Sequence, residues 1–286
     1  MPLIVVPTPI GNMEDMTLRG LRVLREAQII ACEDTRRTLQ LLNFHGIRTP
    51  MVSCHEHNER SRARELLGRV RRGETVALVS DAGTPGLSDP GAFLLSAALA
   101  AGLPVDVLPG ATALVPGLLL SGLPPQPFTF YGFLPEGGSD RRRALEALKT
   151  HPWTLVFYLS PHKAERHLED LASLWGDRAA VLVREISKIH QEAVAGTLPE
   201  LLERARGGFR GELVLVVSGA PDSPPDDEIW RREARTMAQE GHSWRDIAKE
   251  LGERYGIPKN RVKALLFAED EGAEEEEIPG QGLANG

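Results

Sequence analysis

The chain has few cysteines and few aromatic residues, and it contains no long apolar run. Two cysteines among 286 residues cannot form a disulfide framework, and Cys32 and Cys54 lack the spacing of a metal site. No apolar stretch reaches the roughly 18–20 residues that a membrane helix needs. The N-terminus begins at once with a strand-like run, without the basic region of a secretory signal. These absences argue against a secreted disulfide scaffold or a membrane protein, and we expect a cytoplasmic location.

Several well-known catalytic motifs are also missing. The chain has no G-x-G-x-x-G fingerprint and no Walker sequence, which disfavours ordinary NAD and P-loop chemistry. It has no G-x-S-x-G nucleophile elbow, which weakens a hydrolase interpretation. His55-Glu56-His57 lacks the H-E-x-x-H spacing of helical zinc sites. A metal site made of His55, His57 and Asp81 is a weaker alternative, and we expect no metal.

Charge is unevenly distributed along the chain. The formal net charge of −7 equals the charge of the seven acids that follow Ala268, in a stretch without Lys or Arg. The rest of the chain is therefore neutral, and its charge does not argue against a polyanionic partner. We expect the acidic tail, residues 269–286, to be disordered.

Short apolar runs alternate with helical patterns through residues 1–123. Each run is short enough for a buried strand, and a helix pattern follows each one. The strands are expected at Leu3–Val6, Gln28–Cys32, Met51–Cys54, Thr75–Val79 and Val105–Leu108. Five consecutive β–α units predict a doubly wound parallel sheet. Ligands of such sheets bind at the carboxyl ends of the strands.

Four clusters of polar or small residues directly follow these strands. They are Pro7–Asn12, Glu33–Arg37, His55–Glu59 and Ser80–Gly86. The last is the most informative, because its small residues leave backbone N–H and C=O groups accessible to a ligand. An ordinary strand-to-helix connection is the alternative for any single cluster. Together the clusters predict a ligand crevice at one edge of the sheet, and we expect Asp89 beside it to cap the next helix.

The pattern changes near residue 123, where proline and aromatic residues accumulate. Residues 124–220 contain further strand and helix patterns and predict a second α/β domain. A proline-rich linker separates this domain from residues 228–268, whose three helix patterns resemble a small helix-turn-helix bundle. From Ile229 to Phe267 this unit has nine Lys and Arg against five Asp and Glu. It is interpreted either as a nucleic-acid-binding unit or as a packing appendage.

Titratable and cationic side chains of the crevice are the candidates for chemistry. Four of them could position or deprotonate a hydroxyl group, and the sequence does not rank them: Glu33, Asp34, His55 and His57. Four cations at strand ends of the two domains could hold RNA phosphates: Arg36, Arg37, Lys163 and Lys188. The structural alternative for all eight is a solvated, internally paired turn or a polar lining.

Eight motifs, taken in order, resemble one known family. They are PTPIGN, AxEDTR, HxHNE, LVSDAGTP..SDPG, LPGxxAL, FYGFLP, TLVFYxSPHK and REISK. The series is similar to the ribosomal RNA small subunit methyltransferase I family, which belongs to the class III (tetrapyrrole methylase) superfamily. The resemblance covers Leu3 to about Val217 and continues loosely to Phe267.

The resemblance implies a fold, a cofactor and a substrate. The fold is two stacked α/β domains, with S-adenosylmethionine in the cleft between them, and the protein is expected to be a homodimer. The implied reaction is methylation of the ribose 2′-oxygen of a cytidine in the decoding centre of 16S rRNA, free or in the small ribosomal subunit. Two other functions stay open, namely methylation of a tetrapyrrole or other small molecule, and non-catalytic rRNA binding during ribosome assembly.

Position in the superfamily further implies a set of cofactor-contacting residues. They are Pro9, Asp81, Ala82, Gly83, Thr84, Ala111, Thr112, Leu159, Ile186 and Leu213. The cofactor loop of the superfamily commonly reads GDP, whereas this chain has Ser80-Asp81-Ala82 at that place. This departure fits the RNA-modifying branch of the superfamily.

Overall fold

The structure, a computed structural model, describes residues 2–209, 211–221, 227–255 and 257–265. They group into two units, Met1–Ala220 and Pro221–Gly286. Both sheets found among these residues belong to the first unit, and the described part of the second is helical. Within the described ranges, no helix is both long and apolar enough to cross a bilayer.

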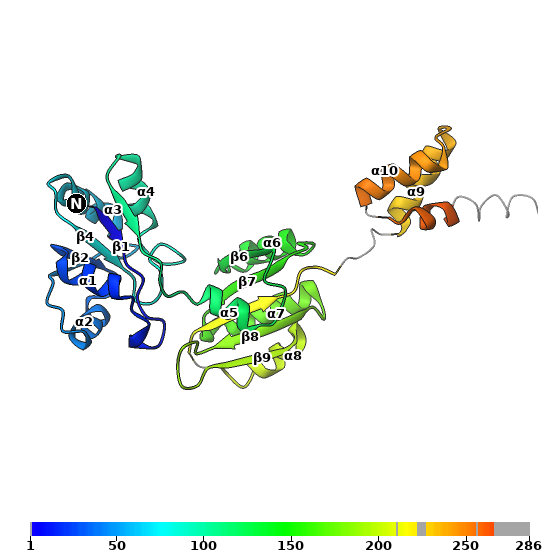
Figure 1. Ribbon diagram of the computed structural model, residues 1–286. Helices are drawn as coiled ribbons and strands as arrows, with labels where there is room; N and C mark the ends of the chain where they lie inside the picture. The colour runs from blue at the N-terminus through cyan, green and yellow to red at the C-terminus, as the bar shows by residue number, and fades with distance from the viewer. Residues whose placement is uncertain (1, 210, 222–226, 256, 266–286) are drawn as a thin grey trace, which may run out of the picture. The chain divides into compact units, whose positions relative to one another are not determined.

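The first sheet is parallel and has five strands (Figure 1). They are β1 (Leu3–Val5), β2 (Ile29–Cys32), β3 (Met51–Ser53), β4 (Val76–Val79) and β5 (Val105–Val107). Their order is β3-β2-β4-β1-β5, and every pairing is parallel. All five strands predicted from the sequence are confirmed to within a residue at each end. They were recognisable because both faces of the sheet are covered, so the central strands are continuous apolar runs.

Alternation along these strands fills two cores, one on each face of the sheet. Ile4 and Ile30 pack against helices α1 (Leu18–Glu26) and α2 (Thr35–Phe44). Leu3 and Leu78 point to the other face, against α3 (Glu59–Arg71) and α4 (Ala92–Ala100). The sheet is therefore doubly wound, as predicted. Helix α2 begins at Thr35, where the side chain of Asp34 caps it.

The second sheet is mixed and also has five strands. They are β6 (Phe128–Phe133), β7 (Thr154–Leu159), β8 (Ala179–Arg184), β9 (Glu192–Thr197) and β10 (Leu213–Val217). Their order is β6-β7-β10-β8-β9, and only the β6–β7 pairing is parallel. The two edge strands, β6 and β9, were not predicted from the sequence. A bulge at Gly132 interrupts β6, and Val194 is the single fully buried residue of β9, so neither has a continuous apolar pattern.

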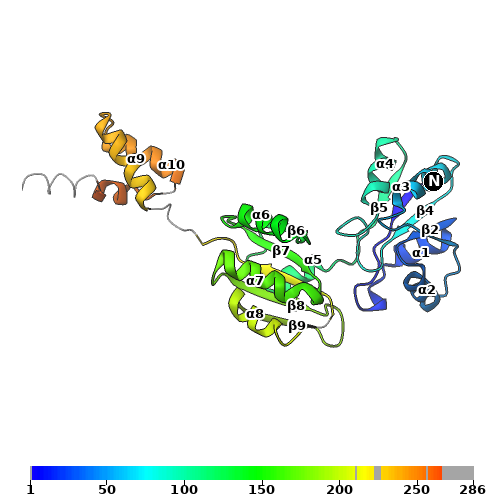
Figure 2. The same ribbon diagram turned by 180° about the vertical axis from the view of Figure 1, so that it is seen from behind.

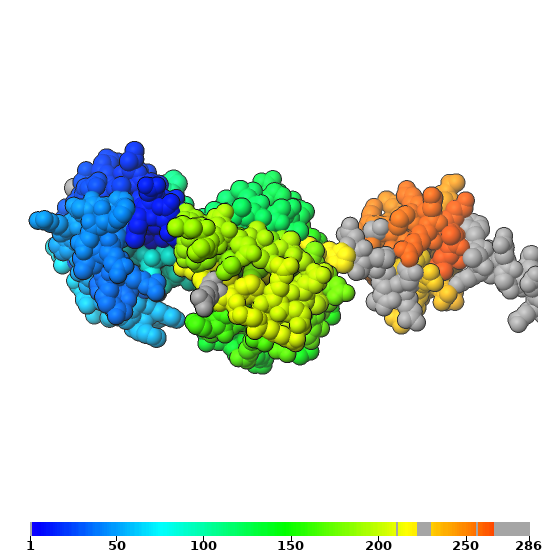
Figure 3. Space-filling view, turned by 90° about the horizontal axis from the view of Figure 1, so that it is seen from below, coloured from blue at the N-terminus to red at the C-terminus, as the bar shows by residue number. Residues whose placement is uncertain are grey.

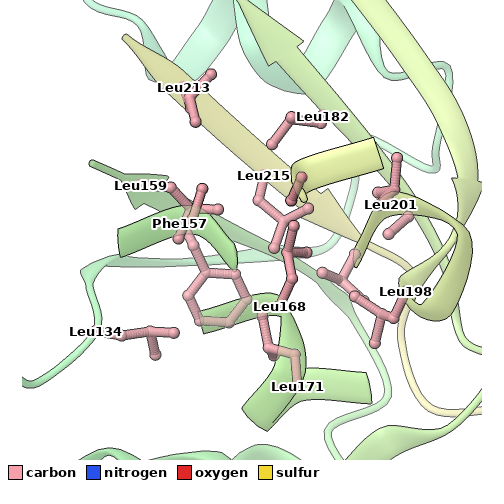
Figure 4. Packing of buried hydrophobic residues seen from close by; sticks show 14 of the residues in the cluster. Leu134, Phe157, Leu159, Leu168, Leu171, Leu182, Leu198, Leu201, Leu213 and Leu215 are labelled. Carbon is pink, nitrogen blue, oxygen red and sulfur yellow. The ribbon is translucent and has the colours of Figure 1, made fainter. Parts of the chain in front are cut away.

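Three helices cover one face of the second sheet: α6 (Gly138–Leu148), α7 (Ala164–Trp175) and α8 (Leu198–Ala205). Figure 4 shows this core, where Phe157 of β7, Leu168 of α7 and Leu215 of β10 gather. The opposite face receives α5 (Leu114–Leu120), as the view from behind in Figure 2 also shows. The sheet is thus buried on both sides.

The two sheets are joined through an apolar cluster on this opposite face. Ile10, from the loop after β1, packs there with Val214 and Val216 of β10 and with Ile186. In the space-filling view of Figure 3, the N-terminal segment (dark blue) lies against yellow-green atoms of the part of the chain that forms the second sheet. A hydrogen bond between Ser187 Oγ and Asp15 Oδ2 supports the same contact.

The second unit has its own small core. Helices α9 (Asp227–Gln239) and α10 (Trp244–Tyr255) and the helical residues 259–265 enclose Trp230, Ile247 and Val262. Three helices follow one another here as the sequence predicted. The acidic tail predicted at residues 269–286 lies outside the described residues.

The packing of α5 on the second sheet can be tested by a substitution at Gly117. A Cβ atom there would lie only 2.7 Å from Cγ1 of Val214, so Gly117→Ala must displace the helix or the strand. We expect this change to lower the free energy of unfolding by about 1–3 kcal/mol in urea denaturation.

The matched control is Gly68→Ala in α3. Its added methyl would meet only the end of the flexible Arg72 side chain, at 3.6 Å. Higher helix propensity should therefore raise the free energy of unfolding by about 0.5–1 kcal/mol. Equal effects of the two alanines would contradict the tight packing inferred for α5.

Candidate functional site

Three adjoining cavities lie at the carboxyl end of the first sheet, where it meets the second. Ile10 lines all three, and Glu212 is shared by the first and second cavities. Their volumes are about 150, 260 and 630 Å³. Together they are ample for a small-molecule ligand, since such sites span roughly 300–1,000 Å³. Three of the four clusters predicted to form the crevice contribute to these cavities, the cluster His55–Glu59 does not, and the second sheet completes the site.

Backbone contacts between strand-end loops fix the floor of these cavities. Thr8 and Gly83 exchange two backbone hydrogen bonds, of 2.8 and 2.9 Å. The Thr8 hydroxyl donates to the carbonyl of Ser80, and the Thr84 hydroxyl donates to the carbonyl of Ala111. Gly83 has a φ of +79°, in the left-handed region that favours glycine. The loops after β1, β4 and β5 are thus tied together before any ligand arrives.

The ten residues that the resemblance implies for cofactor binding all line these cavities. The first cavity contains Ala82, Gly83, Thr84, Thr112, Leu159 and Leu213. The second contains Pro9 and Asp81, and the third contains Ala111 and Ile186. The structure brings them together from both sheets. Their contact with a cofactor stays a prediction.

The four catalytic candidates are not among the residues that line the three cavities. Asp34 caps α2 and also accepts two hydrogen bonds from the guanidinium of Arg36, at 2.7 and 3.1 Å. These bonds lower the pKa of Asp34 to about 2, so its carboxylate is a weak proton acceptor. Burial, and then the charge of Asp81, raises the pKa of Glu33. Of these two acids, Glu33 is the better suited to proton transfer.

The two histidines follow β3. His55 Nε2 lies 3.1 Å from the side-chain nitrogen of Asn58, and the His55 and His57 rings meet edge to face. Among the described residues, no three His, Cys, Asp or Glu side chains form a group that could hold a metal ion. The weaker alternative of a site from His55, His57 and Asp81 therefore has no support in this geometry.

The first cavity contains two acids that the sequence did not assign to the site, Asp89 and Glu212. Burial, followed by the charge of Glu33, raises the pKa of Asp89 to about 7, although a hydrogen bond from Ser80 opposes the shift. Asp89 comes directly after the small-residue loop in the sequence, and this position is the feature that could have placed it at the site.

The prediction that Asp89 caps α4 is wrong. The N-cap residue is Gly91, which has a φ of +119° and no capping side chain. The carboxylate of Glu59, at the start of α3, instead accepts hydrogen bonds from the backbone N–H groups of Gly91 and Leu94, at 3.0 and 2.8 Å. Asp89 is therefore left to face the cavity.

The four predicted phosphate-binding cations each pair with an acid of this chain. The pairs are Arg36–Asp34, Arg37–Asp81, Lys163–Glu136 and Lys188–Glu185. The Arg36 and Arg37 side chains are still 88% and 66% exposed. Exposed ion pairs contribute little free energy, so an RNA phosphate can compete for such cations.

Comparisons with known proteins found similar sequences and similar folds. The family model for Tetrapyrrole (Corrin/Porphyrin) Methylases matches residues 2–202. A ribosomal RNA small subunit methyltransferase I from Micromonospora olivasterospora is 45% identical over 91% of this chain and 84% of its own. The protein of that name from Bacillus subtilis (strain 168) is 39% identical, over 91% of this chain and 92% of its own.

Two solved structures share the fold at low identity. One is a uroporphyrin-III C-methyl transferase from Thermus thermophilus complexed with S-adenyl homocysteine, with a TM-score of 0.56 and 24% identity. It covers 76% of this chain and 97% of its own. The other is the methyltransferase CobJ, with a TM-score of 0.60, 21% identity, and coverage of 77% and 94%. At these identities the likeness concerns the fold alone.

Glu59 holds the loop that carries Asp89, and its removal tests this contact. Glu59→Ala leaves two backbone N–H groups of α4 without their acceptor, so the free energy of unfolding should fall by about 1–3 kcal/mol. Amide hydrogen exchange of residues 86–94 should speed up at the same time. The exposed Glu56 supplies the control, because Glu56→Ala should change stability by less than about 0.5 kcal/mol. Unchanged exchange in Glu59→Ala would contradict the role given to Glu59.

Proposed function

The chain belongs to the tetrapyrrole methylase family and, within it, to the ribosomal RNA small subunit methyltransferase I proteins, and we propose that it methylates the ribose 2′-oxygen of a cytidine in the decoding centre of 16S rRNA. The methyl donor is S-adenosylmethionine. The observation that carries the proposal is 45% identity, over 91% of the chain, to a relative of that name. We assign the activity to the cytoplasm, where an rRNA substrate is made.

The cavities suit the shape and charge of this donor. A Cβ atom on Gly83 would point at Ile10 Cγ2 and Ala111 O, at 3.5 and 3.8 Å, so the glycine keeps the floor open. Leu159 and Leu213 provide an apolar wall. Acidic side chains of the first two cavities offer negative charge to a sulfonium ion. The residues that line the cavities thus fit S-adenosylmethionine in shape, apolar surface and charge.

When bound, S-adenosylmethionine supplies a methyl group on a positively charged sulfur with a neutral leaving group. The residues of the chain then have to align the ribose hydroxyl and exclude water, rather than activate the donor. Ile10, Leu159 and Leu213 exclude water, and the tied loops after β1 and β4 keep the floor rigid. A ribose hydroxyl is a weak nucleophile, so a proton acceptor at the cavity adds to the rate.

Features around the cavities suit a single-stranded nucleotide. Phe133 lines the first cavity, is 52% exposed and lies edge-on to Tyr158, with 5.6 Å between ring centroids. Unstacked bases of RNA commonly stack on such rings. Arg37 lines the second cavity, and both Arg37 and its exposed neighbour Arg36 supply positive charge for the RNA backbone.

The C-terminal unit supplies further positive charge for rRNA. Arg245 and Lys263 lie 5.6 and 5.5 Å from the ring of Trp244. Stacked cations and aromatic rings on one small bundle are typical of surfaces that meet nucleic acid. We infer that residues 228–268 add affinity for rRNA and take no part in methyl transfer.

We also propose that the protein is a homodimer. Val115 and Leu119 of α5 are 49% and 63% exposed, and Val107 on the edge strand β5 is 50% exposed. Exposed apolar side chains on an edge strand and a surface helix support an interface between subunits.

The function is tested by treating unmethylated 16S rRNA and small subunits with the protein and S-adenosylmethionine. We expect one cytidine to become 2′-O-methylated and to resist alkaline cleavage, because that cleavage needs a free 2′-hydroxyl. Methylation on the base, or of a tetrapyrrole with rRNA untouched, would overturn the proposal. Binding of rRNA without methyl transfer would favour the assembly-factor alternative.

Gly83→Val should abolish this methylation by weakening donor binding at least about tenfold, because a branched side chain then occupies the floor. Gly73→Val is the matched control. Gly73 has a similar φ of +84° but nothing within 4 Å of its Cβ position, so it imposes the same backbone strain away from the cavities.

A chain ended after Ala220 tests the role of the C-terminal unit. Residues up to Ala220 form one unit with complete sheets, so the shortened protein should fold and bind S-adenosylmethionine. We expect KM for rRNA to rise and kcat to stay within a few-fold, because the loss is in binding. The salt dependence of rRNA affinity should become shallower as phosphate contacts are lost. An unchanged KM would contradict a role in substrate binding.

A further inference from the structure

We propose that Arg141 is a positioning residue for the rRNA substrate, because it fixes the loop after β6 so that the ring of Phe133 is presented to the first cavity. The proposal rests on the function proposed above, since it concerns the base-stacking role given there to Phe133. Arg141 does not line any of the three cavities, so it acts through this loop and not by contact with a ligand.

The loop after β6 needs support from outside the sheet. β6 is an edge strand that pairs only with β7, and the register of that pairing stops at Phe133. Pro135, two residues further on, has no N–H to donate. The side chains point to opposite sides at this place: Phe133 lines the first cavity, whereas Leu134 enters the core under the helices. A rotation of the loop would therefore turn the ring of Phe133 away from the cavity.

A buried arginine supplies this support. Arg141 of α6 is 2% exposed, and its Nη1 donates to the carbonyl oxygens of Pro135 and Glu136, at 3.1 and 3.0 Å. Its Nε donates to Oδ2 of Asp170 in α7, at 2.6 Å. One guanidinium thus ties the loop to α7, and its planar set of donors fixes the loop in one orientation.

The groups around Arg141 preserve this arrangement. His167 of α7 is also buried, and burial, followed by the charge of Arg141, lowers the pKa of its imidazole to about 4. The ring is therefore neutral near pH 7 and does not compete for the carboxylate of Asp170. An ion pair between Lys163 and Glu136 forms a second tie at the protein surface. The loop is thus held from its buried and from its exposed side.

Stability alone does not explain a guanidinium at this place. Taking a charge out of water is costly, and apolar residues of similar volume often stabilise a core at least as well as a buried ion pair. Leu145 of α6 and Leu168 of α7 already belong to the core in which Leu134 lies. An apolar residue at position 141 could extend that core, but it could not donate to two loop carbonyls and so determine where Phe133 lies.

A double-variant cycle with the full-length protein tests whether Arg141 acts through Phe133. Arg141→Lys keeps the charge, but one ammonium group cannot reproduce the forked contacts to two carbonyls and Asp170. We expect KM for rRNA to rise about fivefold, with kcat and the Kd of S-adenosylmethionine within about twofold, because the loss is in substrate binding. Phe133→Ala should raise KM about tenfold, the effect expected for one stacked base. The protein with both changes should be no worse than Phe133→Ala alone.

Arg178→Lys is the matched control. Arg178 is likewise buried beside the second sheet, donates to the carbonyl of Lys149 and lies over the ring of Trp175, at 4.5 Å. It directly precedes β8, whose first residues pair with the end of β10, whereas the cavities lie at the start of β10. Both lysine substitutions should lower the free energy of unfolding, but only Arg141→Lys should raise KM for rRNA.

Two results would overturn the inference. One is an unchanged KM in Arg141→Lys, and the other is a pair of losses that multiply when Arg141→Lys and Phe133→Ala are combined. If Arg141→Lys does not fold, Asp170→Asn takes its place in the cycle and the same two results decide, because the Asp170 side chain is 34% exposed and a neutral amide holds the guanidinium less tightly. Failure of the unaltered protein to methylate rRNA would instead refute the proposed function.

Discussion

The paired backbone hydrogen bonds between Thr8 and Gly83 are the contact on which the rest of the site depends. They join the ends of β1 and β4, which are neighbours in the centre of the first sheet. The left-handed backbone of residue 83, which favours glycine, directs its N–H and C=O groups to Thr8. Ile10 is thereby directed into the apolar face of the second sheet, where the three cavities meet. This pair of backbone hydrogen bonds therefore determines how the loops after β1 and β4 meet, where Ile10 contacts the second sheet and where the ligand site lies.

The two sheets contribute different chemistry to the cavity. The first sheet supplies Asp81, Asp89 and the backbone groups of its strand-end loops, which are polar because strands end there. The second sheet supplies apolar wall, because successive residues of β10 point to opposite faces. Leu215 enters the core under the helices, while Val214 faces Ile10 and the first cavity. The second sheet also adds an acid, Glu212, which lines the first and second cavities.

The parts of the fold that could be predicted are those determined by local pattern. The first sheet was predictable because strands such as β4 are buried on both faces. Edge strands β6 and β9 were not, because solvent covers part of their surface and Gly132 breaks the period. The cofactor residues came from family resemblance, and all ten line the cavities. Asp89 was misassigned because Glu59, the true acceptor for the start of α4, lies 32 residues before Gly91, and no local pattern reveals that contact.

The bulge in β6 has a consequence for how such a site can evolve. A Cβ atom at Gly132 would lie 2.8 Å from the hydroxyl oxygen of Ser88. The loop that contains Ser88 and Asp89 therefore needs a residue without a side chain at position 132 of the second sheet. Neither position can enlarge by itself without pushing the Asp89 loop away from the cavity. The two sites are therefore expected to covary, and exchanging one sheet for that of a relative succeeds only when both positions are exchanged together.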